Sequence, residues 1–302
     1  MAVKPDRRVV GSETAATPTI PLMNSLEPLL AQALAWPTSP PERQLWTWLD
    51  WLDQVEGRLA EGDASPVAKA LNAERGRVAA AVEAVYAAVR EDIRQGRRGL
   101  VARWLDAYRA STGPDPAEAE GFDALDEWLA GVLQLPAPGA PQRTLSAEMV
   151  AYQPTPARHV LDLLHRAALG ADDVLVDIGA GLGQVPLLAA LHGPARALGI
   201  EIEPTLVAAA QSAARALGLP RAQFHCQDVA EADLSTGTLF YLYTPLRGTL
   251  LAQLLAPLRA EAAHRPLRIG AFGPCVEIVA AESWLRPLGD VRRHRVSLFA
   301  SA

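Results

Sequence analysis

Residues 173–193 read DVLVDIGAGLGQVPLLAALHG, and this stretch decides the fold class. It begins with a short apolar run, which is typical of a strand buried on both faces. Gly179, Gly181 and Gly183 follow at alternate positions, where glycine permits backbone conformations that other residues avoid. An apolar segment of helical length completes the stretch. The pattern predicts a strand, a sharp turn and a helix.

The same alternation continues towards the C-terminus. Further strands are predicted in 195–201, 222–228, 237–245 and 266–274, with helices in 204–219 and 247–262 between them. Apolar strands separated by helices indicate parallel βαβ units. We therefore expect a Rossmann-like, doubly wound, mostly parallel sheet, which binds ligands at the carboxyl ends of its strands.

The first half of the chain shows only helical periodicity. Apolar residues recur at steps of three and four in 41–60, 66–95, 100–108 and 122–133. Two starts are predicted from a capping residue followed by proline and an acid, at Ser39 and at Asp115. Trp46, Trp48 and Trp51 in one helix indicate core packing, with a substrate-lining face as the alternative.

A proline-rich stretch, PAPGAP at 136–141, separates the two halves. We predict a flexible tail at 1–20, an all-α accessory domain at 21–135, a linker at 136–145 and a ligand-binding α/β domain at 146–302. The short linker favours a fixed arrangement of the two domains.

Composition excludes several classes of function. The 302 residues carry 28 Lys and Arg against 34 Asp and Glu, a formal charge of −6, which argues against nucleic acid as a partner. Cys226 and Cys275 cannot form a disulfide framework, and the histidines lack metal-ligand spacing. No apolar run reaches the length of a membrane span, and no secretory signal follows Met1. We expect a cytoplasmic protein without a metal site.

Acidic residues end the first three predicted strands. Asp177 ends the first, Glu201 the second and Asp228 the third. A carboxylate at Glu201 can accept hydrogen bonds from vicinal ribose hydroxyls. One at Asp228 can accept from an adenine amino group, with a loop-start acid as the alternative. Glu203 precedes Pro204 and fits a helix start. Gln184 stands where the dinucleotide motif needs its third glycine, and this spacing disfavours NAD as the ligand. The alternative interpretation of the glycine motif is a tight strand-to-helix turn that binds no ligand.

These motifs resemble those of class I S-adenosylmethionine-dependent methyltransferases: VDIGAGLG at 176–183, GIEIEP at 199–204 and QDVAEADL at 227–234. The resemblance implies S-adenosylmethionine as the cofactor. It implies roles for the glycine loop in cradling the methionyl and ribose parts, Asp177 near the amino group, Glu201 at the ribose and Asp228 at the adenine. The family usually has two strands after the fifth. Because one is visible at 290–300, we expect six strands or a seventh within 273–290.

A narrower likeness is to the non-SET histone lysine methyltransferases, in the glycine loop through Gln184 and in AYQPTP at 151–156. It implies a segment closing over the cofactor, with Tyr152, Thr155 and Gln184 near it. Thr155 before Pro156 is also a candidate helix cap. The likeness supports the mode of cofactor binding and not a histone substrate.

Transfer of a methyl group from a sulfonium mainly requires alignment of donor and acceptor. Tyr152 and Tyr243 are the candidate catalytic residues, and Tyr243, with Thr244 and Pro245 after it, is also a candidate contact of the cofactor at the end of the fourth strand. The chain lacks the Asn/Asp-Pro-Pro-Tyr/Phe motif of enzymes that methylate base amines. His192 and His225 are interpreted as structural residues.

The sequence therefore predicts a methyltransferase whose acceptor is a small molecule or a protein. The alternatives are a non-catalytic S-adenosylmethionine-binding or partner-binding protein and another nucleotide-binding α/β enzyme. We expect the helical half to pack beside the cofactor cleft and wall the acceptor site, with Tyr152 near the sulfonium. The sequence predicts no oligomeric state.

Overall fold

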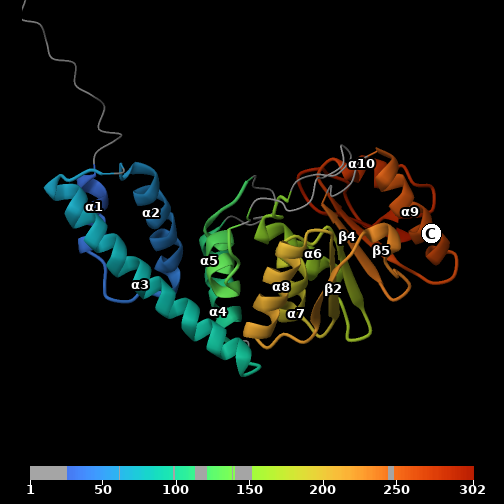
Figure 1. Ribbon diagram of the computed structural model, residues 1–302, viewed down its shortest axis with the longest axis horizontal. Helices are drawn as coiled ribbons and strands as arrows, with labels where there is room; N and C mark the ends of the chain where they lie inside the picture. Colours follow the sequence, from blue (N-terminus) through green and yellow to red (C-terminus); the bar gives the residue numbers. More distant parts are fainter. Residues whose placement is uncertain are drawn as a thin grey trace, which may run out of the picture.

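The computed structural model describes residues 26–60, 62–97, 99–112, 121–137, 139, 152–243 and 248–302. A helical region comes first in the chain and an α/β region follows it (Figure 1). The predicted tail at 1–20, most of the predicted linker, Asp115, and the pair Thr244 and Pro245 lie outside the described residues.

The α/β region is built on one 7-stranded sheet of order β3-β2-β1-β4-β5-β7-β6. Its strands are β1 (Val174–Ile178), β2 (Arg196–Glu201), β3 (Ala222–Cys226), β4 (Leu239–Tyr243), β5 (Arg268–Phe272), β6 (Leu285–Pro287) and β7 (Ser297–Ser301). The first five are parallel, whereas β7 runs antiparallel to β5 and to β6. The expectation of a seventh strand within 273–290 is confirmed by β6.

Helices cover both faces of this sheet (Figure 1). One face packs under α6 (Ala157–Ala167), α7 (Gln184–His192) and α8 (Pro204–Ala216); the other packs under α9 (Gly248–Ala262) and α10 (Cys275–Ala280). Alternate residues of β1 enter different cores, Leu175 on the first face and Val174 and Val176 on the second. The predicted fold class, a Rossmann-like doubly wound sheet after a helical region, is confirmed.

The helical region contains α1 (Glu27–Leu34), α2 (Leu45–Arg58), α3 (Pro66–Arg94), α4 (Gly99–Ser111) and α5 (Ala124–Leu133). The sequence did not predict α1. The predicted cap at Ser39 is wrong, because a 3₁₀ turn at Glu42–Gln44 precedes the helix and α2 begins at Leu45. Ser65 does cap α3: its hydroxyl accepts a hydrogen bond from the Ala68 amide at 3.1 Å.

The tryptophans of α2 belong to the core of the helical region. Trp48 and Trp51 are almost fully buried, and Trp46 is 5% exposed. Trp36 stacks on Trp48 with ring centroids 4.8 Å apart. The Trp51 indole donates a hydrogen bond to the Leu29 carbonyl at 3.0 Å, which ties α1 to α2. These contacts support the core interpretation over a substrate-lining face.

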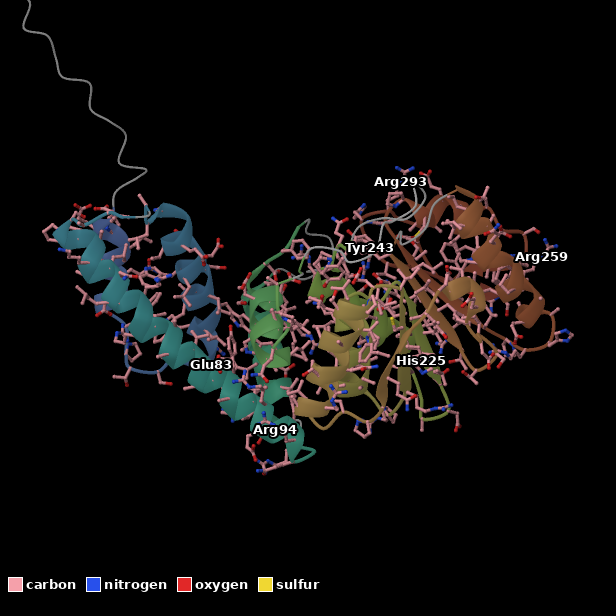
Figure 2. The ribbon with its side chains drawn as sticks, in the orientation of Figure 1. Glu83, Arg94, His225, Tyr243, Arg259 and Arg293 are labelled. Atoms are coloured by element: carbon pink, nitrogen blue, oxygen red, sulfur yellow. The ribbon has the colours of Figure 1, made fainter. Side chains whose placement is uncertain are left out.

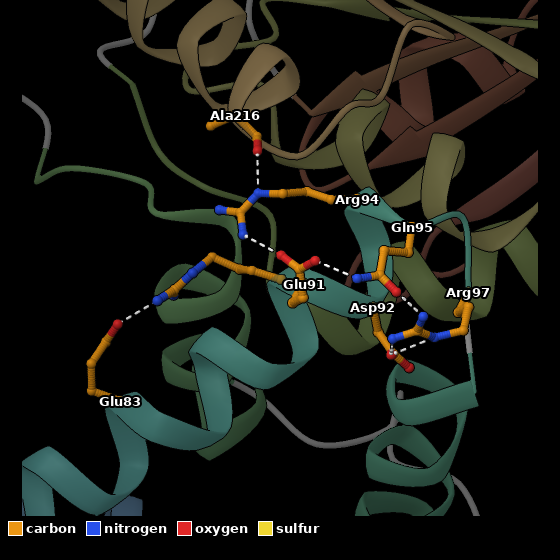
Figure 3. A network of polar contacts seen from close by, with 8 residues as sticks. Glu83, Glu91, Asp92, Arg94, Gln95, Arg97 and Ala216 are labelled. Atoms are coloured by element: carbon orange, nitrogen blue, oxygen red, sulfur yellow. Dashed lines mark hydrogen bonds and ion pairs between the residues drawn. The ribbon is translucent and has the colours of Figure 1, made fainter.

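The helical region packs against the helices on the first face of the sheet. The end of α3 reaches the end of α8, where the Arg94 guanidinium donates to the Ala216 carbonyl at 2.9 Å (Figure 3). Glu91 pairs with the same arginine from the preceding turn. The apolar core of the helical region continues without a break into that of α6, α7 and α8. The structure therefore shows the two regions in direct contact.

No helix within the described ranges is both long and apolar enough to cross a membrane.

Candidate functional site

The glycine loop joins the end of β1 to the start of α7 at the carboxyl edge of the sheet. Gly179, Gly181 and Gly183 all have positive φ, of 76°, 54° and 79°. A Cβ on Gly183 would lie 2.4 Å from the Phe224 ring, and one on Gly181 would lie 2.0 Å from the Tyr152 ring. Other residues would be strained or would clash here, so the loop requires glycine. Gln184 is the first residue of α7 and is half-buried.

Glu201 binds this loop from the end of β2. Its Oε2 accepts a hydrogen bond from the Gly181 amide at 2.9 Å. Its Oε1 accepts from the Ile202 amide at 2.8 Å and the Glu203 amide at 2.9 Å. A carboxylate offers about four acceptor positions. Three are taken, so about one remains on Oε2 for a ligand. The structure thus brings the predicted ribose-binding acid and the glycine loop together.

Asp177 lies beside the loop near the end of β1. Its side chain is 4% exposed. Burial, together with the charge of Glu201, raises the pKa of Asp177 to about 8. Without a bound cation the carboxyl group is therefore largely protonated at neutral pH. A positively charged ligand group placed beside it would favour the ionised form.

Asp228 and Glu203 occupy the starts of helical turns. Asp228, two residues beyond β3, accepts a hydrogen bond from the Ala230 amide at 2.9 Å and caps a 3₁₀ turn, η4 (Val229–Glu231). It is half-buried. Glu203 precedes α8, is 5% exposed and accepts the Thr205 hydroxyl at 2.9 Å. The helix-start interpretation of Glu203 fits this position.

Tyr152 and Thr155 lie in the segment that leads into α6. The Tyr152 ring covers Gly181, and its hydroxyl interacts with the Leu182 backbone. Burial, with Asp177 and Glu201 nearby, raises the pKa of Tyr152 to about 12. Thr155 is 5% exposed, and its hydroxyl lies 2.8 Å from the Tyr241 hydroxyl. It does not cap α6, because Pro156 occupies the cap position.

The carboxyl ends of β4 and β5 carry a row of rings. Tyr243 and Phe272 are paired across the two strands, with ring centroids 4.7 Å apart. His159, on the first turn of α6, lies 4.6 Å from Phe272. Figure 2 shows Tyr243 at the same end of the sheet as Arg293. These rings and the glycine loop lie along the same carboxyl edge of the sheet, because β4 is the neighbour of β1 and Tyr241 pairs with Asp177.

His159 is the residue that the sequence reasoning missed. Its side chain is 2% exposed, and Nδ1 has no hydrogen-bond partner. Burial and the charge of Arg158 lower the pKa of His159 to about 4, so the ring is neutral at pH 7. His192 and His225, which the sequence analysis interpreted as structural residues, are both exposed. No local pattern marks His159, because its position depends on α6 folding over β5.

The residues at this edge fit S-adenosylmethionine. The loop allows a ligand close to the backbone, Glu201 retains an acceptor position, and the buried Asp177 suits a cationic group. The described part of the chain holds no cluster of three or more metal-ligating side chains. Asp228 and Gln184 begin the helical turns that follow β3 and the glycine loop, and among the described residues no hydrogen bond joins either side chain to the Glu201 carboxylate.

No protein-family model and no curated protein matches the chain at the level of sequence. Solved structures do match. An RNA methyltransferase from Salinibacter ruber, in complex with S-adenosyl-L-homocysteine, is 29% identical, with 49% of this chain and 92% of that one covered and a TM-score of 0.40. A ribosomal protein L11 methylase from Lactobacillus delbrueckii subsp. bulgaricus is 17% identical, covering 48% and 77%, with a TM-score of 0.37.

A TehB-like SAM-dependent methyltransferase from Corynebacterium glutamicum is 17% identical, covering 48% of this chain and 88% of that one, with a TM-score of 0.35. Each match covers about half of this chain.

The architecture described above, with 7 strands of which β7 is antiparallel to its neighbours, is the class I methyltransferase fold. The resemblance seen in the sequence is confirmed at the level of the fold. The likeness to histone lysine methyltransferases stays a prediction.

Proposed function

We propose that this protein binds S-adenosylmethionine at the carboxyl ends of β1, β2 and β3 and transfers its methyl group to an acceptor at the ends of β4 and β5. The observation that carries the proposal is the bond between Glu201 Oε2 and the Gly181 amide. It fixes the second-strand acid against the glycine loop, with Asp177 beside them.

Glu201 would hold the ribose. The free acceptor position on Oε2 suits one hydroxyl group directly, and the two bonds on Oε1 keep the carboxylate from rotating. Charge-assisted hydrogen bonds of this kind contribute on the order of 1.5–3 kcal/mol each. Asp228 would receive the adenine amino group, with Gln184 near the start of α7.

Asp177 would bind the amino group of the methionyl part. In the unliganded protein its carboxyl group is protonated at pH 7, because its pKa is raised to about 8. An ammonium group at contact distance lowers that pKa, and the proton is then released. Tyr152 would cover the ligand from the side of α6, because its ring lies over Gly181.

The acceptor would be held at the ring row of Tyr243, Phe272 and His159. S-adenosylmethionine supplies a methyl group on a positively charged sulfur, which needs no further activation. The protein's contribution is then orientation, which accounts for roughly 7–11 kcal/mol of barrier in well-aligned reactions. His159 is neutral at pH 7, so its ring can hydrogen-bond the methyl acceptor without placing a charge beside it.

The acceptor class remains that proposed from the sequence, a small molecule or a protein. The formal charge of −6 disfavours nucleic acid as the acceptor. We also propose that residues 21–135 form the accessory domain and 146–302 the methyltransferase domain of a cytoplasmic enzyme.

The test is calorimetric titration of the full chain with S-adenosylmethionine, S-adenosylhomocysteine and NAD. We expect both sulfur compounds to bind and NAD not to bind. Release of S-adenosylhomocysteine in the presence of cell extract would support transfer. Binding without release across extracts and small-molecule panels would favour the non-catalytic alternative. Binding of NAD alone would overturn the proposal.

A further inference from the structure

The first turn of α5 holds the first residue of α6. Asp126 Oδ1 accepts a hydrogen bond from the Ala157 amide at 2.7 Å. Asp126 Oδ2 accepts from the Asp123 amide at 2.9 Å, which closes a capping box on α5 itself. One carboxylate therefore caps its own helix and fixes the start of the next, across 31 residues of sequence.

Charged groups surround this contact, and the half-buried Asp123 and Asp126 form one joint with the buried Arg158. Asp123 accepts the Tyr108 hydroxyl at 2.6 Å and the Arg158 guanidinium at 2.8 Å. Arg158 is 4% exposed and also donates to the Gly121 carbonyl. The joint thus draws on α4, α5 and α6. This network favours one geometry, because breaking a bond to the buried Arg158 leaves a buried charge with fewer partners.

The joint stands directly beside the segment that covers the candidate site. Residues 152–156 form neither helix nor strand and lead directly into Ala157, the first residue of α6. Within that segment, Thr155 is bonded to Tyr241, and the Tyr152 ring lies on Gly181. The position of the segment therefore depends on its contacts with the sheet and on the anchor at Ala157.

We propose that Asp126 is a positioning residue for the cofactor site: by fixing the start of α6, it holds Tyr152 and Thr155 over the glycine loop. The helical region would then contribute to cofactor affinity through one carboxylate, without touching the ligand. The inference rests on the proposed function.

The electrostatics of the joint give the proposal a pH signature. Burial is the main cause that raises the pKa of Asp126 to about 6; Asp123 adds to the rise, whereas Arg158 and the two bonded amides oppose it. Tyr108 faces the joint through Asp123, and Asp50 is electrostatically coupled to Asp123. At pH 7.5 both Asp126 oxygens accept; at pH 5 the group is protonated and one oxygen carries the proton.

The experiment measures S-adenosylhomocysteine affinity by calorimetry on the full chain at pH 7.5 and pH 5. Asp126→Asn cannot accept both amides, so we expect its affinity at pH 7.5 to fall about tenfold, within the usual range of coupling between sites. At pH 5 the deficit relative to wild type should shrink to less than about threefold, because wild-type Asp126 is then protonated. Glu127→Gln, an exposed neighbour on α5, is the control and should match wild type at both pH values.

The outcomes separate this inference from the proposed function. Wild-type protein that does not bind S-adenosylhomocysteine would overturn both. Wild-type binding with unchanged affinity of a folded Asp126→Asn variant, or a deficit equal at the two pH values, would overturn the inference alone. If the variant does not fold, amide hydrogen exchange of residues 152–160 in the wild type replaces it. Protection corrected for intrinsic rates should be lower at pH 5 than at pH 7.5, and equal protection would contradict the proposal.

Discussion

The hydroxyl groups of Thr155 and Tyr241 lie 2.8 Å apart in a buried contact between the segment before α6 and the central part of the sheet. Tyr241 is paired with Asp177 in β1, so the contact lies one strand from the candidate cofactor site. It joins the segment that carries Tyr152 to the strand that carries Tyr243. The cofactor side and the acceptor side of the carboxyl edge thus share one buried hydrogen bond.

Thr155→Val and Tyr241→Phe should each lower the free energy of unfolding by about 1–3 kcal/mol, because each leaves the partner hydroxyl buried without its bond. The double variant should lose less than the sum, with a coupling of about 0.5–1.5 kcal/mol. Urea denaturation of the four proteins measures this cycle. Strictly additive losses would show that the hydroxyls do not interact in solution.

Glu201→Ala should weaken S-adenosylmethionine binding about ten- to several-hundredfold, because it removes the ribose acceptor and frees the Gly181 amide. Glu203→Ala is the matched control from the same turn. It removes a carboxylate bonded to Thr205 and should mainly lower stability, by about 0.5–2 kcal/mol. Calorimetry and thermal melting on both variants make the comparison. A larger loss of affinity in Glu203→Ala would contradict the ribose assignment.

Asp177 should make the unliganded protein less stable as pH rises. Its pKa is raised from 3.8 to about 8 in the folded protein, so between those values the folded state keeps a proton that the unfolded state has lost. The stability of wild type relative to Asp177→Asn should therefore fall with rising pH, by up to about 1.4 kcal/mol per pH unit. Denaturant titrations at pH 5, 6 and 7 measure the difference, and a flat difference would refute the raised pKa.

Binding of S-adenosylmethionine should release protons at pH 7, because the ligand's ammonium group returns Asp177 to its ionised form. Calorimetry in buffers of different ionisation enthalpy counts the protons released. Adenosine, which lacks the amino-acid part, should release markedly fewer. Equal release with both ligands would place the ammonium group away from Asp177.

Substitutions in the glycine loop should separate folding from binding. Gly183 has a positive φ of 79°, and an added Cβ would lie 2.4 Å from Phe224. We therefore expect Gly183→Ala to lower the free energy of unfolding by about 2–4 kcal/mol. In Gly181→Ala the added Cβ contacts the Tyr152 ring, which can move. The loss in free energy of S-adenosylhomocysteine binding should therefore exceed the loss in free energy of unfolding. Gly96→Ala, with φ of 68° and open space around it, should cost only about 1–2 kcal/mol. Melting and calorimetry on all three test this order.

Local patterns in the sequence predicted the parallel strands and most of the helices, but not α1. Short apolar runs between helical segments predicted the five parallel strands; β1 and β4 in the middle of the sheet are almost entirely buried, as strands covered on both faces are, whereas the edge strand β3 is partly exposed. Alternate glycines predicted the turn after β1, because only glycine fits its positive φ values. The acid at the end of β2 could be placed at the same edge as that turn, since parallel strands share one carboxyl edge. Short β6 was predicted only through the family resemblance, because three residues carry little periodicity.

Other features depended on contacts between segments far apart in the chain. Ser39 looks like a cap, yet α2 begins at Leu45 after a 3₁₀ turn, because local capping preference is weak against tertiary packing. His159 and Phe272 come together only when α6 folds over β5.

The sequence by itself determined the five parallel strands, the glycine turn and the acids at the carboxyl edge, because these follow from periodicity and backbone sterics within a few residues. Only the tertiary structure decided that Asp126 holds Ala157, that Thr155 meets Tyr241 and that Asp177 is buried beside Glu201. The physical reason is that hydrogen bonding and burial of these groups are set by the packing of separate elements, which no local pattern of residues encodes.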